Sequence, residues 1–325
     1  MDARTGRQKV ELGKVLKLVV LLLCVVTRRA ATTQQAQSNN TEDFVRVEMR
    51  NIFYHFNDRI AVHISQLEGK LIPTRQGAVP VFDDKQSFVL ALDSAAISIS
   101  TDAMANVLND RIFAKPDAPL KKVSISASGK ILKIRGKLHS KGDISFEGEG
   151  SIAPTPEGQI RIHAEKVKAA HLPVKGIMDL LGVEVSDLIK TNKVRGIRAE
   201  GNDLILNPEQ ILPQPHIQGR VTDVQIKGNQ IVQTFGEKKN ADSGEKQPGN
   251  YMAYRGAQLT FGKLTMKDTD MILIDMDPKD PFDFYLDHYK DQLVAGYTKI
   301  TPAFGLRVFM RDFNKLPKGR TRAQH

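Results

Sequence analysis

The chain of 325 residues contains a single cysteine, Cys24, and no tryptophan. A zinc cluster and a disulfide framework each need several cysteines, so both are excluded. The sequence also lacks the G-x-S-x-G, H-E-x-x-H, Walker and G-x-G-x-x-G motifs. These are signatures of hydrolases, zinc peptidases and nucleotide-binding enzymes. The absences favour a protein that is not an enzyme and needs no cofactor.

A hydrophobic run long enough to cross a membrane is missing near the N-terminus. Residues 18–26, LVVLLLCVV, follow a basic stretch, but nine residues are too few for a membrane-spanning helix, which needs about 20. A basic region before a short apolar run is typical of a secretory signal. We therefore expect residues 1–30 to be a signal peptide, with a short uncleaved signal anchor as the alternative. Either places the protein in the periplasm or cell envelope.

The net charge of +10 is unevenly distributed along the chain. Residues 1–29 contribute +5 and residues 313–325 contribute +4, so residues 30–312 carry only +1. A surface that binds nucleic acid needs many clustered cations, so we expect no nucleic-acid partner. The basic tail, 317–325, is predicted to be solvated, with a contact to anionic membrane headgroups as the alternative.

Apolar and polar residues alternate along much of the chain after Phe44. The clearest runs lie at 123–128, 131–138, 143–152 and 160–165, and turn-forming triplets such as SGK and PEG separate them. A period of two indicates half-buried antiparallel strands, and the turns predict a meander. Further strands are expected near 194–206, 216–227, 230–235, 251–266, 270–276 and 305–311.

Helical spacing is confined to three segments. Thr101 is a predicted N-cap before a short apolar stripe, and residues 173–190 predict one or two short helices. Asp280 and Pro281 are the predicted N-cap and first residue of the third helix. Its apolar stripe comprises Phe282, Tyr285, Leu286, Tyr289 and Leu293. A large antiparallel sheet with few helices defines an α+β fold.

Polar segments suggest the domain boundaries. Residues 31–43 are polar and are predicted to be a linker. Residues 237–250 are rich in charge and poor in apolar residues, which indicates a flexible loop. This loop separates a main domain at 44–236 from a C-terminal extension of strands and a helix at 251–316.

Acidic residues are concentrated at 268–291, where Asp275, Asp277 and Asp280 are candidate calcium ligands. The segment lacks the glycine and the terminal glutamate of an EF-hand loop. Helix capping and the helix dipole already account for Asp280 and Asp283. No histidine lies at ligand spacing from a cysteine or another histidine. We therefore predict no metal site.

An amphipathic sheet of this size must bury its apolar face against helices or around a cavity. A dry cavity suits an acyl chain, because each buried CH₂ contributes about 0.8 kcal/mol. The candidate lipid-binding residues are apolar residues of the helices that face the sheet, with ordinary core packing as the alternative for each. They are Met104, Val107, Leu108, Ile112, Ile177, Met178, Leu180 and Leu181.

Four stretches carry a resemblance to a known family: SFVLALDSAAISISTDAMANVLN, the successive strands at 120–167, AAHLPVKGIMDLLGVEVSDLIK and LNPEQILPQPHIQGRVTDVQIKGNQIVQTFG. With these, residues 87–236 resemble the LmeA-like family of exported phospholipid-binding proteins, part of the tubular lipid-binding group. The resemblance implies a large curved antiparallel sheet that wraps the helices, with lipid tails in the groove. Residues 251–316 lie outside it and resemble only uncharacterised bacterial proteins.

The sequence therefore predicts a non-enzymatic lipid-binding protein of the bacterial envelope, which holds phospholipid-like amphiphiles in an apolar groove. The alternative is a structural or interaction module with a solid core, which binds an envelope protein. A third hypothesis is a hydrolase that uses Asp275 and Asp277, but nothing in the sequence supplies a substrate pocket for it.

Overall fold

The structure of the protein is a computed structural model that describes residues 44–139, 143–169, 184–191, 194–237 and 249–317. The described residues belong to one compact unit. The predicted signal segment, the linker at 31–43, most of the loop at 237–250, most of the helical segment at 173–190 and nearly all of the basic tail lie outside these residues.

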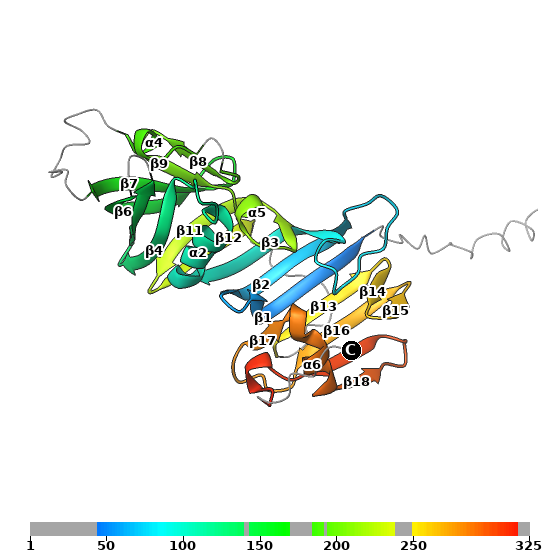
Figure 1. Ribbon diagram of the computed structural model, residues 1–325. Coiled ribbons are helices and arrows are strands. Elements are labelled where there is room, and N and C mark those ends of the chain that lie inside the picture. Colours follow the sequence, from blue (N-terminus) through cyan, green and yellow to red (C-terminus); the bar gives the residue numbers. More distant parts are fainter. Residues whose placement is uncertain (1–43, 140–142, 170–183, 192–193, 238–248, 318–325) are drawn as a thin grey trace, which may run out of the picture. The chain divides into compact units, whose positions relative to one another are not determined.

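The larger of two main sheets has eleven strands in the order β11-β12-β3-β2-β1-β13-β16-β19-β18, with β10 paired to β3 and β17 paired to β1 (Figure 1). These strands are β1 (Val45–Asn57), β2 (Ile60–Pro73), β3 (Phe88–Ser100), β10 (His216–Gln218), β11 (Val221–Lys227), β12 (Gln230–Gly236), β13 (Tyr251–Gly256), β16 (Thr269–Asp275), β17 (Phe282–Tyr285), β18 (Tyr297–Ile300) and β19 (Leu306–Met310). Most neighbours are antiparallel, whereas the pairs β1–β17, β3–β10 and β16–β19 are parallel.

The second main sheet has six antiparallel strands in the order β4-β5-β6-β7-β9-β8. They are β4 (Leu120–Ser128), β5 (Ile131–His139), β6 (Asp143–Pro154), β7 (Ile160–Ala169), β8 (Ile197–Glu200) and β9 (Asp203–Leu206). The meander predicted from the alternation at 123–165 is confirmed by β4 to β7. A small hairpin of β14 (Leu259–Phe261) and β15 (Leu264–Met266) forms a further sheet.

The alternation of buried and exposed residues is interrupted in both β1 and β2, at positions that pair with each other. In β1 the buried series runs to Met49 and resumes at Ile52, with Asn51 between them at a left-handed φ of 53°. In β2 the buried series is interrupted between Ile64 and Leu67. These two residues pair with Ile52 and Met49 respectively. Irregularities of this kind keep one face of a strand buried on both sides of the shift. Residues at both ends of β1 therefore face the same core.

The helix predicted after Thr101 is confirmed as α2 (Thr101–Val107), which continues into a π-helical turn, η1 (Leu108–Ile112). Its N-cap is Ser100, one residue earlier than predicted, because the Ser100 hydroxyl accepts a hydrogen bond of 3.0 Å from the Ala103 amide. The other short described helices are α4 (Val185–Leu188), α5 (Pro208–Ile211) and η3 (Phe313–Lys315).

The helix predicted to begin at Asp280 and Pro281 is wrong over its first residues. Phe282–Tyr285 forms β17, and only then follow the 3-10 turn η2 (Leu286–His288) and α6 (Tyr289–Val294). All four residues of β17 are buried, so a helical stripe with one polar face does not describe them. Parallel pairing with the second half of β1 satisfies their backbone groups instead.

The C-terminal segment 251–316 completes the larger sheet. β13 pairs with the first half of β1, and β16, β19 and β18 follow outward from β13. The predicted boundary at 237–250 therefore does not separate two sheets. The main hydrophobic core cluster includes residues from both sides of that segment, such as Leu67 and Phe284.

Candidate functional site

The predicted lipid-binding residues of the first helix lie in the packed core. Met104, Val107 and Leu108 are almost fully buried and Ile112 is half-buried. The helix α2 packs mainly against β4 and also contacts β2 and β3. None of these four residues lines either of the apolar pockets described below, so their contact with a ligand stays a prediction. The other four candidates, Ile177, Met178, Leu180 and Leu181, lie outside the described residues.

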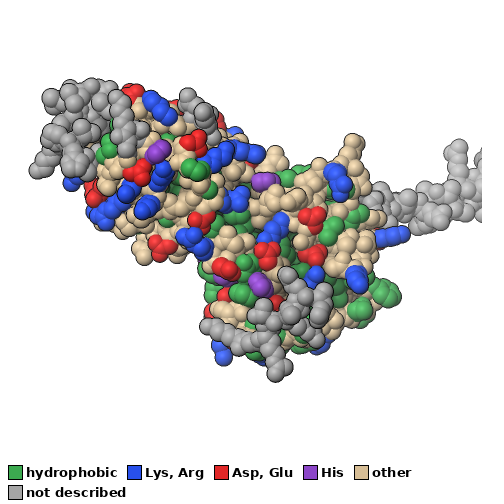
Figure 2. All heavy atoms as spheres, viewed as in Figure 1, with side chains coloured by type: hydrophobic (Ala, Val, Ile, Leu, Met, Phe, Trp, Pro, Cys, Tyr) green, Lys and Arg blue, Asp and Glu red, His purple; other side chains and the backbone are tan. Residues whose placement is uncertain are grey.

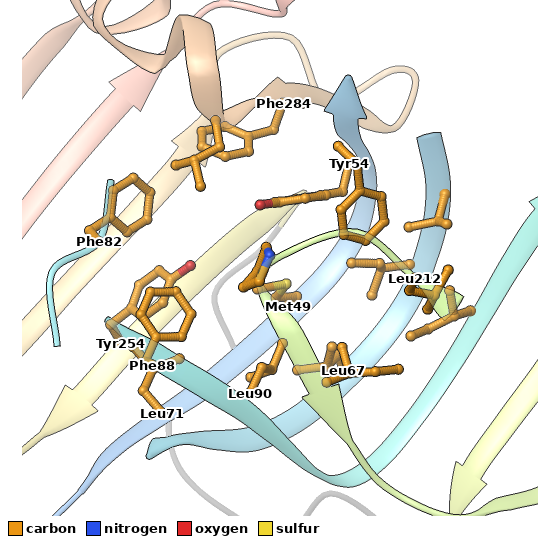
Figure 3. A pocket seen from close by; sticks show the side chains of 17 residues that line it. Met49, Tyr54, Leu67, Leu71, Phe82, Phe88, Leu90, Leu212, Tyr254 and Phe284 are labelled. Atoms are coloured by element: carbon orange, nitrogen blue, oxygen red, sulfur yellow. The ribbon is translucent and has the colours of Figure 1, made fainter. Parts of the chain in front are cut away.

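The larger sheet instead carries an apolar pocket that is built mainly by strands (Figure 3). Residues from β1, β2 and β3 form its floor, and β13, β17 and η2 contribute one side. The segment at 212–217, which includes part of β10, contributes another. The labelled lining residues are Met49, Tyr54, Leu67, Leu71, Phe82, Phe88, Leu90, Leu212, Tyr254 and Phe284.

Both parts of the sequence contribute to this pocket. Leu212 and Ile217 belong to the region that carries the family resemblance, whereas Tyr254 and Phe284 belong to the C-terminal segment outside it. The close-up shows the side chains of Leu212, Tyr254 and Phe284 around one space (Figure 3). The C-terminal segment is therefore part of the pocket wall.

Two tyrosines supply the hydroxyl groups of the lining. The hydroxyls of Tyr54 and Tyr254 point into the pocket (Figure 3). Burial raises the pKa of both tyrosines above the ordinary value, and for Tyr54 the neighbouring Tyr254 adds to the effect. Both side chains therefore stay neutral at physiological pH, and each can donate a hydrogen bond to a ligand oxygen.

The pocket is small in the described conformation. It is partly enclosed and has about 60 Å³ of interior space, less than half of the roughly 150 Å³ of an engineered apolar cavity that binds benzene. An acyl tail therefore fits only if lining side chains move. Met49 is suited to such movement, because methionine is unbranched and adapts its shape to its surroundings.

The six-stranded sheet carries a second apolar pocket, with about 70 Å³ of interior space. Its lining includes the inward-facing residues Ile134, Phe146, Ile162 and Leu204, with Val185 from α4. This sheet therefore buries its apolar face with little space to spare. Its opposite face is polar and basic.

Two glutamates of β6 lie on that polar face, each between cations of the neighbouring strands. The rows are Lys133–Glu149–Lys166 and Arg135–Glu147–Lys168. The Lys133 ammonium lies 3.2 Å from a Glu149 carboxylate oxygen, and the Arg135 Nε lies 3.2 Å from one of Glu147. Hydrogen bonds from Arg135 and from Lys133 are the largest causes that lower the pKa of Glu147 and of Glu149.

These pKa shifts predict how the ion pairs respond to acid. A carboxylate with a lowered folded-state pKa stabilises the fold fully above its ordinary pKa of about 4.3, and the contribution is lost as the pH falls through the folded-state value. We expect the double variant Glu147→Gln, Glu149→Gln to have a lower Tm than the parent at neutral pH. The difference should disappear as the pH falls well below about 4.

Thermal unfolding at a series of pH values measures this effect. The control is Glu165→Gln in β7, because Glu165 is exposed and forms no ion pair with another residue that the structure describes. A Tm difference of the double variant that persists unchanged in acid would show that the ion pairs are not its cause.

The polar side of this sheet has a hollow around the row Arg135–Glu147–Lys168. Lys122, Arg135, Lys137 and Lys168 line an open hollow of about 530 Å³ together with Ser145 and Glu147. Figure 2 shows Lys and Arg side chains gathered over β4 and β6. We call the outward side of β4 to β7, with this hollow, the basic face.

Two of the three candidate calcium ligands, Asp277 and Asp280, contact a lysine. The Lys315 ammonium lies 3.1 Å from Asp277, 2.8 Å from Asp280 and 2.8 Å from Asp312. Asp275 accepts hydrogen bonds from Asn250 and from the Asp277 amide, and burial raises its pKa. Within the described ranges, no group of three or more His, Asp or Glu residues is arranged to hold a metal ion.

Comparisons with protein-family models, with curated proteins and with solved structures gave no match. Among the helices that the structure describes, none is long and apolar enough to cross a membrane.

Proposed function

We propose that the protein is a non-enzymatic lipid-binding protein of the bacterial envelope, which holds the tail of a phospholipid-like amphiphile in the apolar pocket of the larger sheet. The observation that carries the proposal is the lining of this pocket. Seventeen residues line it, and apart from two tyrosine hydroxyls and one thioether their side chains are hydrocarbon. Each CH₂ group buried there contributes about 0.8 kcal/mol.

The tyrosines orient the ligand in this proposal. Tyr54 and Tyr254 are protonated at physiological pH, as tyrosines ordinarily are, and burial raises the pKa of both further. A neutral phenol donates a hydrogen bond to an ester or carboxyl oxygen without the cost of burying a charge. The pair therefore favours an amphiphile whose oxygen-bearing end lies near the hydroxyls and whose tail lies among Met49, Leu67 and Leu90.

Entry of a tail requires the pocket to widen. The wall formed by Leu212, Pro215 and Ile217 is joined to the large sheet by β10, which has only three residues. Few backbone hydrogen bonds therefore hold this wall, and we propose that it moves outward when a tail binds. The resemblance of residues 87–236 to the LmeA-like family and the predicted secretory signal support a role in the envelope.

The alternative function is a structural or interaction module with a solid core. The small volume of both apolar pockets, about 60 and 70 Å³, favours this alternative. The two functions differ in whether the pocket takes up hydrocarbon, which a matched pair of methionine variants tests.

Met49→Gln is expected to lower the affinity for a fluorescent fatty acid about tenfold. The substitution keeps the size of the side chain but places an unpaired amide in a dry pocket, which costs about 1–3 kcal/mol. Met104→Gln is the control, because Met104 is equally buried but does not line the pocket. Its affinity should stay within about twofold of the parent. Titration of the purified proteins measures both values.

The opposite pattern, with the loss at Met104, would place the ligand at the first helix as the sequence predicts. Freshly purified parent protein should also release an amphiphile on organic extraction, detected by mass spectrometry. If it releases none and takes up no fluorescent fatty acid, the lipid-binding proposal is wrong and the solid-core alternative is favoured.

A further inference from the structure

The basic face stands out against the charge of the rest of the chain. Residues 30–312 have a net charge of only +1. Seven cations and three carboxylates lie in the hollow or in the cross-strand rows beside it, a net charge of +4, so the remainder of this region carries −3. The cations are Lys121, Lys122, Lys133, Arg135, Lys137, Lys166 and Lys168, and the carboxylates are Asp143, Glu147 and Glu149.

Three cations of the hollow form no close ion pair, although Lys168 interacts electrostatically with Glu147, and Lys137 with Asp143, over a longer distance. Lys122, Lys137 and Lys168 form no close ion pair with another described residue, whereas Arg135 pairs with Glu147. Three positive charges therefore share an open hollow with one neutralised pair. The hollow therefore has a net charge of +3, and a concave surface of one sign of charge attracts anions.

The backbone holds one of these lysines in an uncommon conformation. Lys122 has a left-handed φ of 52° where β4 bulges between Lys121 and Ser124. The Asn109 side chain from η1 fixes this bulge, because it donates a hydrogen bond of 2.7 Å to the Val123 carbonyl and accepts one of 2.8 Å from the Val123 amide. A non-glycine residue in this region costs energy and persists only where the surroundings enforce it.

The chemistry of the face indicates the kind of anion. Ser145 lines the hollow, and Ser124 lies beside Arg135 on the neighbouring strand, so hydroxyl donors accompany the cations. Phe146, the one phenylalanine, tyrosine or tryptophan in the described strands β4 to β7, is half-buried and also lines the apolar pocket of this sheet. The half-buried Phe146 ring also lines the hollow, so the described part of the face offers no fully exposed phenylalanine, tyrosine or tryptophan ring on which unpaired bases stack.

We propose that the basic face docks on membranes rich in anionic phospholipids, with lipid phosphates bound in the hollow by Lys122, Lys137 and Lys168. An anionic membrane surface attracts clustered lysines over a distance of about 8 Å at physiological ionic strength. Docking goes beyond the pocket proposal, because a protein can bind a membrane surface without taking a lipid tail into its core.

The first test measures sedimentation of the full chain with vesicles. Parent protein should bind vesicles of phosphatidylcholine and phosphatidylglycerol more tightly than vesicles of phosphatidylcholine alone. We expect Lys137→Gln, Lys168→Gln to lose affinity for the anionic vesicles about 30-fold, the loss for two lysine charges near a membrane. The control is Lys227→Gln, Lys263→Gln, which removes the same charge from exposed lysines elsewhere. An equal loss in this control would overturn the proposal.

Lys122→Gly removes the charge of this lysine and is compatible with the backbone conformation of the bulge. Glycine adopts a left-handed φ without strain, so the Tm should not fall, while affinity for anionic vesicles should drop about fivefold. An unchanged affinity with an intact Tm would contradict the role of the hollow. Tight binding of an oligonucleotide that depends on the same lysines would likewise replace the membrane with nucleic acid as the partner.

A dye on the basic face separates this contact from binding by the basic ends of the chain. In a Cys24→Ser background, a dye at Ser124→Cys should be quenched by brominated anionic lipid, and a dye at Thr298→Cys in β18, at the opposite edge of the larger sheet from β11, should not. Both serine and threonine are exposed. Equal quenching at the two positions would overturn the proposal. Lys137→Gln, Lys168→Gln should leave the uptake of a soluble fluorescent fatty acid unchanged, because neither lysine lines the apolar pocket, so failure of the pocket proposal and failure of docking remain distinguishable.

Discussion

Asp312→Ala is expected to lower the free energy of unfolding by roughly 3 kcal/mol, because a buried donor loses its charged acceptor. Asp312 is 1 % exposed. One of its carboxylate oxygens accepts a hydrogen bond of 2.9 Å from the buried Asp283 amide, and the other lies 2.8 Å from the Lys315 ammonium. The variant leaves the amide unsatisfied and removes the best-buried partner of the lysine. A loss of this size lowers the Tm by roughly 6–12 °C.

Asp277→Ala provides the matched control for this prediction. It removes a second carboxylate from the same lysine, but the Asp277 side chain is about half exposed, and exposed ion pairs contribute little. Thermal and urea unfolding of the two variants measure the difference. Equal losses would show that the charge of the lysine, rather than the buried link between β17 and η3, determines the stability of this region.

The arrangement around Lys315 gives the acidic segment an ion-pair partner that its sequence alone does not indicate. Asp275, Asp277 and Asp280 are close enough in the chain to suggest a calcium loop. Their nearest cation comes from Lys315, 35 residues beyond Asp280. Local spacing contains no information on such a distant partner. The same limit applies to His55, which lies 2.7 Å from Asp283 across the parallel pair of β1 and β17.

Strands with one buried face were predictable, whereas a strand with both faces buried was not. In β4 to β7 the alternation of residues such as Ile134 and Arg135 records directly which face meets the core. In β17, Phe282 and Phe284 are buried beside Asp283 and Tyr285, so the pattern has no period of two. Aromatic residues three and four apart then suggested a helix. The segment forms a strand instead, because its backbone pairs with β1.

The alternation of each strand predicts which of the pocket residues face the core, but it does not predict that they line one pocket. Met49, Leu67 and Leu90 occupy the buried positions of three alternating strands, so each was readable as an inward-facing residue. The sequence favoured helix residues as the ligand contacts, because a sheet wrapped around a helix was the expected architecture. Only the order of strands in the larger sheet brings Tyr254 and Phe284 to the same space.

Phe284→Ala is expected to destabilise the protein by about 3–5 kcal/mol and, at the same time, to improve the uptake of hydrocarbon. Phe284 is 1 % exposed and its ring lines the apolar pocket. Removal of the ring adds a benzene-sized volume to an interior space of about 60 Å³. If two more CH₂ groups of a tail enter the enlarged pocket, the affinity for a fluorescent fatty acid rises roughly tenfold.

Phe282→Ala is the control for this gain, because Phe282 lies two residues earlier on β17, is fully buried and does not line the pocket. It should cost a similar free energy of unfolding, measured in urea, while the affinity for the fatty acid stays within about twofold of the parent. A gain in both variants would mean that the probe binds loosened cores in general. A gain in neither would mean that the space around Met49 and Tyr254 closes when a ring is removed, which is the behaviour of a solid core and not of a lipid pocket.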